Sequence, residues 1–545
     1  MIGLIAKPED HDVAREFFEL FKTPWEFYRP EERYDVMLCV SEEFPVGAVS
    51  EAKLTIVYGG QELRCDCEDK IEIGTYRKGG TVFYKGEEFP AYGDVLTFLD
   101  DQNNILLKEQ QTLQSVAVRR RVGGKNLVRI GYNLFQEIRL LLSIGQPLNY
   151  AGIPTVEIHI ALLRDLIVES GVALIEIPPI PEGYAFIACL THDVDHPSIR
   201  QHRWDHTAWG FLYRALVGTV LEVLRGRAPV RHLMKNWTAA MKLPFVYLGL
   251  SKDFWVDFDQ YLCIEQQVGS TFFVLPFKGK PGRTENGSAP RMRAAAYGVA
   301  DIDDRIHTVM RNGGEIGVHG IDAWMDNVRG AVEKAQVEKV AGTKITGIRM
   351  HWLYFNGESP VLLEKAGFAY DSTVGYNETV GYRAGTMQVY KPNNVSRLLE
   401  LPMHVMDTAL FYPAHLGLSS EEATERVGAL IVNAMKRGGV LTFNWHDRSI
   451  APERLWGEFY KDLLMWLMQS GAWCTSANRA VCWFQNRRAL TFKRSGHGIE
   501  IESARNHAEL YQDIPGVRVH MYNTAGKEVE APPGVPIYCH EEIQA

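Results

Sequence analysis

The sequence predicts an α/β protein whose central part is a parallel sheet, either open or closed as a barrel. Between residues 184 and 490, short apolar segments alternate with helical ones, the pattern of strands joined by crossover helices. Helical segments end at Gly, a residue that favours helix termination. Polar residues that carry chemistry follow the apolar segments, at the expected carboxyl ends of the strands.

Six segments of this central part are short and apolar enough to be strands. They are Ala185–Leu190, Ser270–Leu275, Glu315–Val318, Gly347–Met350, Leu398–Pro402 and Val440–Asn444. Helices are expected over Asp301–Arg311, before Gly313-Gly314, and over Ser359–Ala366, before Gly367.

Residues 1–180 are expected to form a mixed α/β domain, to which no chemical motif gives a role. Its expected strands are Ile2–Ala6, Tyr34–Val40, Ala52–Tyr58 and Thr81–Tyr84, and its expected helices are Asp10–Phe21, Leu127–Ile144 and Thr155–Glu169. The Pro/Gly-rich segment Ile177–Gly183 is the best boundary, which divides the chain into 1–180, 181–490 and 491–545. The last range is expected to be a small β appendage, with strand signals at Ile499–Ile501, Val517–Tyr522 and Ile537–Cys539.

Composition narrows the functional classes. The chain has 545 residues and a net charge of -9, which argues against a nucleic-acid-binding surface. The eight cysteines have irregular spacing, which favours free thiols in a reducing compartment. The segment Met1–Lys7 has no basic region and no long apolar region, so we expect no secretory signal and a cytoplasmic protein. No run of 18 uncharged apolar residues occurs, so no transmembrane helix is expected.

One amphipathic segment, Trp209–Leu224, comes closest to a membrane element. It contains Arg214 and Glu222 and has basic residues on both sides. Three tryptophans in and around it permit peripheral membrane contact. A core helix with a solvated basic face is the alternative that the composition favours.

The strongest chemical signal is Thr191-His192-Asp193-Val194-Asp195-His196, which follows an apolar segment. Two carboxylates this close are costly unless a cation or a proton lies between them. The intervening Val194 puts Asp193 and Asp195 on one face of a strand. One carboxylate can then bind a metal while the other acts as a base, which predicts a hydrolytic site.

Six motifs follow one another in residues 184–485: Thr191-His192-Asp193-Val194-Asp195, His319-Gly320, Arg349, Tyr370-Asp371-Ser372, Leu399-Glu400-Leu401-Pro402 and Trp445-His446. In this order they resemble the motifs of the polysaccharide deacetylases, the NodB-homology carbohydrate esterases. This resemblance implies a distorted (β/α) barrel of about seven parallel strands. An N-terminal α/β domain and a small C-terminal β segment would flank it. It also implies metal-dependent hydrolysis of N-acetyl groups on sugars.

The resemblance implies a role for each matching residue. Asp193 would be the general base and His446 the general acid. Arg349 would hold Asp193 ionised, and Asp371 would support the site from behind.

The metal ligands implied by the resemblance are Asp195 and His319. The family places a second histidine four residues after the first, where this chain has Ala323. Asp322 is the best substitute if the segment is helical, because i and i+3 share a helical face. The most expected metal is Zn²⁺, and iron, manganese and cobalt are alternatives to it. A metal-free hydrolase is the alternative to any metal site.

Substrate contacts are expected from aromatic residues near the motifs. Trp324, Trp352 and Trp445 could stack on sugar rings or could equally be buried. His351 is as readily a packing residue as a substrate contact.

We therefore expect a metal-dependent hydrolase of non-peptide carbon–nitrogen bonds. It would remove an N-acetyl group from a sugar or from a nucleotide-linked or lipid-linked intermediate in glycan assembly. A hydrolase of a non-sugar amide is one alternative. A non-catalytic glycan-binding protein on a deacetylase scaffold is another, motivated by the missing second histidine.

Overall fold

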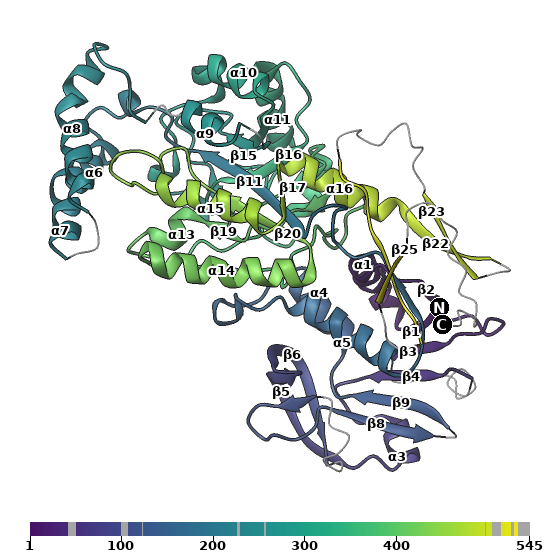
Figure 1. Cartoon of the computed structure of the whole chain (residues 1–545). Coiled ribbons are helices and arrows are strands. Elements are labelled where there is room, and N and C mark those ends of the chain that lie inside the picture. Colours follow the sequence, from purple (N-terminus) through teal and green to yellow (C-terminus); the bar gives the residue numbers. More distant parts are fainter. Residues whose placement is uncertain are drawn as a thin grey trace. The chain divides into compact units, whose positions relative to one another are not determined.

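A computed structural model describes most of the chain (Figure 1). The described residues are 1–41, 51–99, 107–122, 124–225, 229–255, 258–266, 268–495, 498–503, 514–524 and 528–531. Contacts divide the chain into two compact units. Unit 1 comprises Met1–Gly183, Tyr382–Asn393 and Trp483–Ala545, and unit 2 comprises Tyr184–Gly381 and Asn394–Cys482. The described residues of 491–545, expected as a small β appendage, belong to unit 1.

Unit 2 is built on a curled parallel sheet, as the alternation of strands and helices predicts. The strand order is β18-β17-β16-β15-β12-β11-β20-β19, with β21 also paired to β11, and every pair is parallel. The strands are β11 (Phe186–Val194), β12 (Thr271–Val274), β15 (Glu315–Gly320), β16 (Gly347–Met350), β17 (Tyr370–Asp371), β18 (Leu399–Glu400), β19 (Val405–Met406), β20 (Val440–Asn444) and β21 (Ala472–Thr475). Within the described residues no ladder joins β18 to β19, so the sheet is open there.

Two of the expected strands, Gly347–Met350 and Val440–Asn444, have the bounds that the sequence predicts. β11 runs past its expected end to Val194, so Asp193 is fixed within the sheet rather than in a loop. The helices around this sheet are α9 (Phe258–Ile264), α10 (Asp303–Arg311), α11 (Asn327–Ala341), α12 (Ser359–Lys365), α13 (Asp407–Phe411), α14 (Ser420–Arg437) and α15 (Gly457–Gln469). Another helix, α16 (Ala477–Ala489), includes the boundary between the units.

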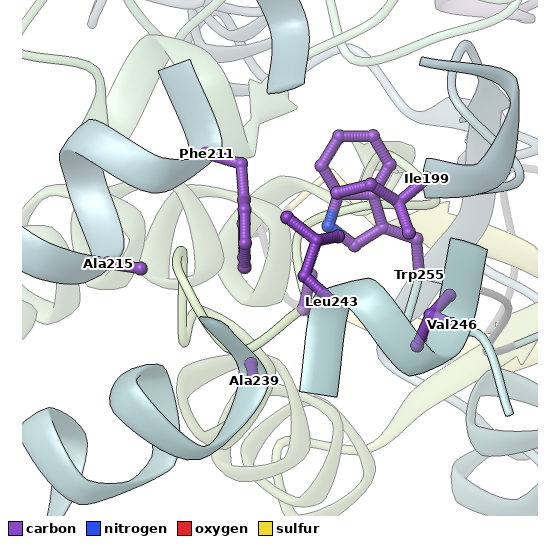
Figure 2. Close-up of a cluster of buried hydrophobic side chains, with 8 residues drawn as sticks. Ile199, Phe211, Ala215, Ala239, Leu243, Val246 and Trp255 are labelled. Carbon is purple, nitrogen blue, oxygen red and sulfur yellow. The ribbon is translucent and has the colours of Figure 1, made fainter. Parts of the chain in front are cut away.

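A helical hairpin is inserted between β11 and β12. Its first arm is α6 (His206–Tyr213), a π-helical turn (Arg214–Gly218) and α7 (Thr219–Leu224), and its second arm is α8 (Val230–Tyr247). The two arms pack through a buried apolar cluster (Figure 2). Its labelled members are Ile199, Phe211, Ala215, Ala239, Leu243, Val246 and Trp255. Inside the hairpin Asn236 donates to the Thr219 hydroxyl at 2.6 Å.

Unit 1 contains a six-stranded sheet of order β2-β1-β3-β4-β9-β8, in which only the β8–β9 pair is antiparallel. Its strands are β1 (Ile2–Ala6), β2 (Trp25–Phe27), β3 (Val36–Val40), β4 (Leu54–Tyr58), β8 (Ala117–Val122) and β9 (Lys125–Ile130). The helices of this unit include α1 (His11–Phe21), α3 (Arg64–Glu68), α4 (Leu134–Leu141) and α5 (Thr155–Glu169).

The expected helix Leu127–Ile144 is wrong in its first part. Residues 127–130 belong to β9, which pairs with β4 in the centre of the sheet. The helix α4 begins only after Asn133, whose side chain accepts the Gln136 N–H at 3.1 Å as an N-cap. An apolar run of this length satisfies either assignment, and pairing with β4 decides it.

Smaller sheets complete unit 1. β5 (Ile73–Tyr84) pairs with β6 (Glu87–Phe98) and β7 (Lys108–Glu109), and β22 (Leu490–Ser495) pairs with β23 (Gly498–Ser503). β24 (Val519–Tyr522) pairs with both β10 (Leu174–Glu176) and β25 (Glu528–Ala531). The expected strand Ile537–Cys539 lies outside the described residues. Cys39, Cys65, Cys67, Cys189, Cys263 and Cys474 have free thiols.

Candidate active site

The end of β11 places Asp193 between two hydrogen-bond donors. Arg349 of β16 donates from Nη1 to Oδ1 at 3.0 Å, and Asn444 of β20 donates from Nδ2 to Oδ2 at 2.8 Å. Burial alone would raise the pKa of Asp193, but the charges of Arg349, His319 and His446 bring it below its ordinary value. The side chain is therefore an ionised carboxylate held in one orientation.

Arg349 is itself fixed by the strand beside it. Its Nε donates to the Ser372 carbonyl at 2.9 Å and its Nη2 to the Ser372 hydroxyl at 2.9 Å. Nη1 also reaches the Thr191 hydroxyl at 2.7 Å. The guanidinium is fully buried and lies over Phe273, 4.6 Å from the ring centroid. The guanidinium that pairs with Asp193 is thus held by Ser372, directly after β17, and by Thr191 of β11.

Asp195, His319 and His351 form a second group, with ligand atoms that all lie within 4.8 Å of one another. His319 Nδ1 lies 3.0 Å from the Arg349 carbonyl, to which it can donate, leaving Nε2 3.4 Å from Asp195 Oδ1. His351 Nε2 lies 3.5 Å from the same oxygen. This is the geometry of three ligands aimed at one point.

The residues of this group fit a divalent cation. Asp195 Oδ1 is buried and has no hydrogen-bond partner, an arrangement that a cation would relieve. Burial lowers the pKa of His351 to about 3, which keeps its imidazole neutral and able to act as a ligand. One carboxylate and two imidazoles are a donor set that Zn²⁺ accepts.

Asp322, the expected third ligand, does not join this group. Its carboxylate accepts from Arg329 Nη1 at 2.5 Å and from the Arg283 amide at 2.8 Å. The expectation assumed a helix after His319, but α11 begins only at Asn327. The intervening turn is held instead by Glu333, which accepts the backbone N–H groups of Ile321 and Asp322.

His446 is paired with a carboxylate that the sequence analysis did not single out. Its Nδ1 lies 2.6 Å from Asp407 Oδ1, and its backbone N–H donates to Asp407 Oδ2 at 2.7 Å. Burial would lower the pKa of His446, but Asp407 outweighs burial and raises it to about 9. The other ring nitrogen, Nε2, lies 3.8 Å from Asp195 Oδ2. His446 is thus a protonated imidazole beside the Asp195 group.

Asp371 lies outside the pocket. It is buried, accepts from the Thr373 hydroxyl at 2.5 Å, and has Glu400 next to it. Burial raises the pKa of Asp371 to about 6. The charge of Arg349 opposes this rise, so Asp371 acts on Arg349 from outside the pocket.

The three tryptophans have different environments. Trp445 is completely buried and packs on Phe459, so it cannot meet a sugar. Trp324 is 3% exposed and does not line the pocket. Trp352 lines the pocket. Trp324 and Trp445 do not face a substrate, because each indole is buried by packing.

The backbone that carries His351 and Trp352 is strained and clamped. Trp352 has φ 64°, a left-handed conformation uncommon for a bulky residue. The buried guanidinium of Arg293 donates to the His351 carbonyl at 2.7 Å and to the Ile321 carbonyl at 3.1 Å. These bonds hold the turn in the conformation that presents His351 to Asp195.

Asp193, the Asp195–His319–His351 group and His446 open into a pocket of about 520 Å³. Its lining includes Asp193, Asp195, His319, His351, Trp352 and His446. The volume is in the range of small-molecule sites.

The sequence analysis named His351 only as a packing residue or substrate contact and did not single out Asn444 or Asp407, although His351 and Asn444 had a readable signal. His351 lies two residues after Arg349, the period that puts both on one face of a strand. Asn444 likewise lies two residues before His446. For Asp407 the only signal is its place directly after the apolar pair Val405–Met406.

Comparison with known proteins gives matches in structure alone. No protein-family model matches the chain, and no curated protein matches its sequence. A protein from Mycobacterium smegmatis described as a polysaccharide deacetylase is similar, with 21% identity and a TM-score of 0.34 over 55% of this chain and 92% of that one. The chain resembles polysaccharide deacetylases.

Two further structures are of the same kind. A probable polysaccharide deacetylase from Pseudomonas aeruginosa PAO1 has 13% identity and a TM-score of 0.34 over 55% of this chain and 91% of that one. The carbohydrate deacetylase Agd3 covers 96% of this chain and 91% of its own, with 8% identity and a TM-score of 0.32. Because these TM-scores are below 0.5, the function proposed next rests on the residues of this chain.

Proposed function

We propose that the chain is a metal-dependent hydrolase that removes the acetyl group from an N-acetylated sugar. The observation that carries the proposal is the meeting of three groups in one pocket: the Asp193–Arg349 pair, the Asp195–His319–His351 group and the His446–Asp407 pair. They correspond to a base, a ligand set and an acid, the three functions that amide hydrolysis needs.

In this proposal the reaction breaks the amide C–N bond with one water. Asp193 accepts a proton from the water as the water oxygen bonds to the acetyl carbon. His446 donates its proton to the amine nitrogen as that nitrogen leaves, which yields acetate and the free amine. Arg349 and Asn444 keep Asp193 in the orientation of a base.

Asp195, His319 and His351 would hold the divalent cation. A cation bound there supplies Lewis acidity to the acetyl carbonyl. Zn²⁺ is the proposed metal because two imidazoles and one carboxylate are common in catalytic zinc sites. His351 would take the place of the second histidine, whose expected position is occupied by Ala323.

We further infer that the substrate carries phosphate, as nucleotide-linked and lipid-linked sugars do. Arg214, Arg448 and Arg454 line the pocket. Two of them have a buried N–H group without an acceptor: Nε of Arg214 and Nη1 of Arg454. Such unpaired donors are costly, and a phosphate oxygen would satisfy them.

The charge around these arginines supports the same inference. Burial lowers the pKa of Arg448 to about 9, and the charges of Arg454 and Arg214 contribute to the shift. Arg454 also lowers the pKa of Tyr412, which lines the pocket. Glu453 forms an ion pair with Arg448, 3.4 Å from its Nε, and the charge of Arg454 also acts on Asp407. Three arginines in one pocket favour an anionic ligand.

The test is acetate release from two matched substrates, a free N-acetylhexosamine and the same sugar linked to a nucleoside diphosphate. Wild-type protein should release one acetate per substrate and prefer the phosphorylated one, and Asp193→Asn should release none. If Asp193→Asn binds substrate as wild type does and wild type also releases nothing, the chain is a glycan-binding protein. Acetate release only from non-sugar amides would favour the other hydrolase alternative.

A further inference from the structure

The hairpin formed by α6, the π-helical turn, α7 and α8 has an apolar face that the protein leaves uncovered. About half of the exposed large hydrophobic side chains of the described residues lie between Trp204 and Leu250, a stretch of less than a tenth of the chain. In Figure 1 these helices stand together at one end of unit 2, away from its sheet. Apolar surface concentrated in this way marks an interaction site.

The second arm shows the pattern most clearly. One face of α8 is buried: Asn236 bonds to Thr219 of the first arm, and Ala239, Leu243 and Val246 belong to the apolar cluster of Figure 2. A second apolar stripe recurs every three or four residues on the solvent side. It consists of Val230, Met234, Trp237, Met241, Phe245 and Leu248, of which Met234 is 67% and Met241 69% exposed. A helix that only covered a core would place polar residues there.

The first arm contributes the same kind of surface. Trp209, Tyr213, Leu216 and Leu224 are exposed on it, and Trp204 precedes it with 82% of its surface exposed. Together with Trp237, these tryptophans give the face the amphipathic aromatic rings that settle at the boundary between lipid and water.

Charge identifies the occupant. Residues 199–255 contain nine lysines and arginines against three acidic residues, whereas the whole chain has a net charge of -9. No Asp or Glu occurs between Glu222 and Asp253. Arg231, Lys235 and Lys242 are exposed alongside the apolar stripe of α8, and the first two also approach Glu458 at 3.0 and 3.2 Å. Apolar residues flanked by cations complement an anionic lipid surface.

We propose that this face docks the protein onto an anionic lipid bilayer, with the helices lying in the interface. The segment His206–Leu224 is long and apolar enough to span a membrane by length and composition. It does not need to, because Arg214 and Glu222 interrupt it and its inner face is committed to α8 through Phe211, Ala215 and Thr219. Lying flat leaves that packing intact and buries the outer stripe.

Docking would place the pocket at the membrane surface. His206, Thr207, Gly210 and Arg214 of the same hairpin line that pocket. A sugar on a lipid phosphate would then reach the site without leaving the bilayer. This consequence rests on the proposed hydrolase, whereas the docking itself does not.

The experiment is flotation of the full-length protein with vesicles of phosphatidylcholine containing about a third phosphatidylglycerol, compared with phosphatidylcholine alone. Wild type should float with the anionic vesicles and lose most of that binding at high salt. Met234→Ser/Met241→Ser should weaken binding about tenfold or more, because two interfacial apolar groups are lost. The matched control is Val432→Ser/Met435→Ser on α14, whose side chains are 62% and 50% exposed and which should bind like wild type.

A second variant tests the charge independently of the apolar stripe. Lys242→Glu should weaken binding to anionic vesicles and leave thermal stability unchanged, because the side chain is exposed. Failure of wild type to float, or equal flotation of the Met234→Ser/Met241→Ser variant, would overturn the proposal. A concentration-dependent dimer that this variant abolishes, without vesicle binding, would assign the face to a second copy. Flotation needs no substrate, and Asp193→Asn should float normally, so its result is separate from that for hydrolysis.

Discussion

His351 lies beside His319 with ring centroids 4.9 Å apart, although His319 belongs to β15 and His351 begins the 3₁₀ turn after β16. Their side chains approach the same Asp195 oxygen at 3.5 and 3.4 Å. A histidine pair can therefore be assembled from β15 and the turn after β16 instead of along one helical turn. The absence of a histidine at position 323 does not remove the ligand set.

The first prediction concerns metal binding. His351→Ala should lower affinity for Zn²⁺ by at least about a hundredfold, because loss of a ligand costs more than the ten- to hundredfold typical of its supporting partners. The measurement is elemental analysis after chelation and reloading. His319→Ala, which removes the other histidine, should lose the metal in the same way. Asp322→Ala should retain the metal, since its carboxylate is bonded to Arg329 and the Arg283 amide. Equal metal content in His351→Ala and wild type would remove His351 from the ligand set.

The second prediction concerns the base. Asp193→Asn should reduce kcat by about 10²- to 10⁴-fold, the contribution typical of a general base. Asn444 can rotate to pair with the new amide, so the fold should persist. Acetate release and circular dichroism of the same sample separate these effects. If the variant keeps more than a tenth of wild-type kcat, the loss is smaller than that of a general base, and another group takes the proton.

The third prediction concerns pH. His446 must be protonated to donate, and Asp407 raises its pKa to about 9 against the opposing effect of burial. Since the raised pKa keeps the acid protonated as pH rises, activity should fall only above that pKa. Asp407→Asn removes the stabilising charge, so the alkaline limb of the kcat profile should move to lower pH by about one unit or more. An unchanged alkaline limb in Asp407→Asn would show that another group sets it.

The parallel sheet and much of the site could be predicted because they depend on local patterns. Asp193 and Asp195 lie at the end of an apolar strand, and parallel strands bring such ends together. Asp322 could not be placed, since whether residues 321–326 form a helix depends on the distant Glu333 carboxylate. The expected substrate contact of Trp445 is wrong for a similar reason. Its burial against Phe459 is a tertiary contact that no local pattern encodes.

The last prediction separates substrate classes by the arginines of the pocket. Arg454 has a buried Nη1 without an acceptor and lies over Trp456, 4.9 Å from the ring centroid. Arg454→Gln should raise KM for the nucleotide-linked sugar by about ten- to a hundredfold, since a hydrogen bond to a charged group contributes about 1.5–3 kcal/mol. KM for the free N-acetylhexosamine should not change, because that substrate has no phosphate to lose contact with. Steady-state kinetics on the two substrates measures both effects, and Arg479→Gln, which lies outside the pocket lining, is the matched control. An equal rise in KM for both substrates would mean that Arg454 supports the pocket wall and binds no phosphate.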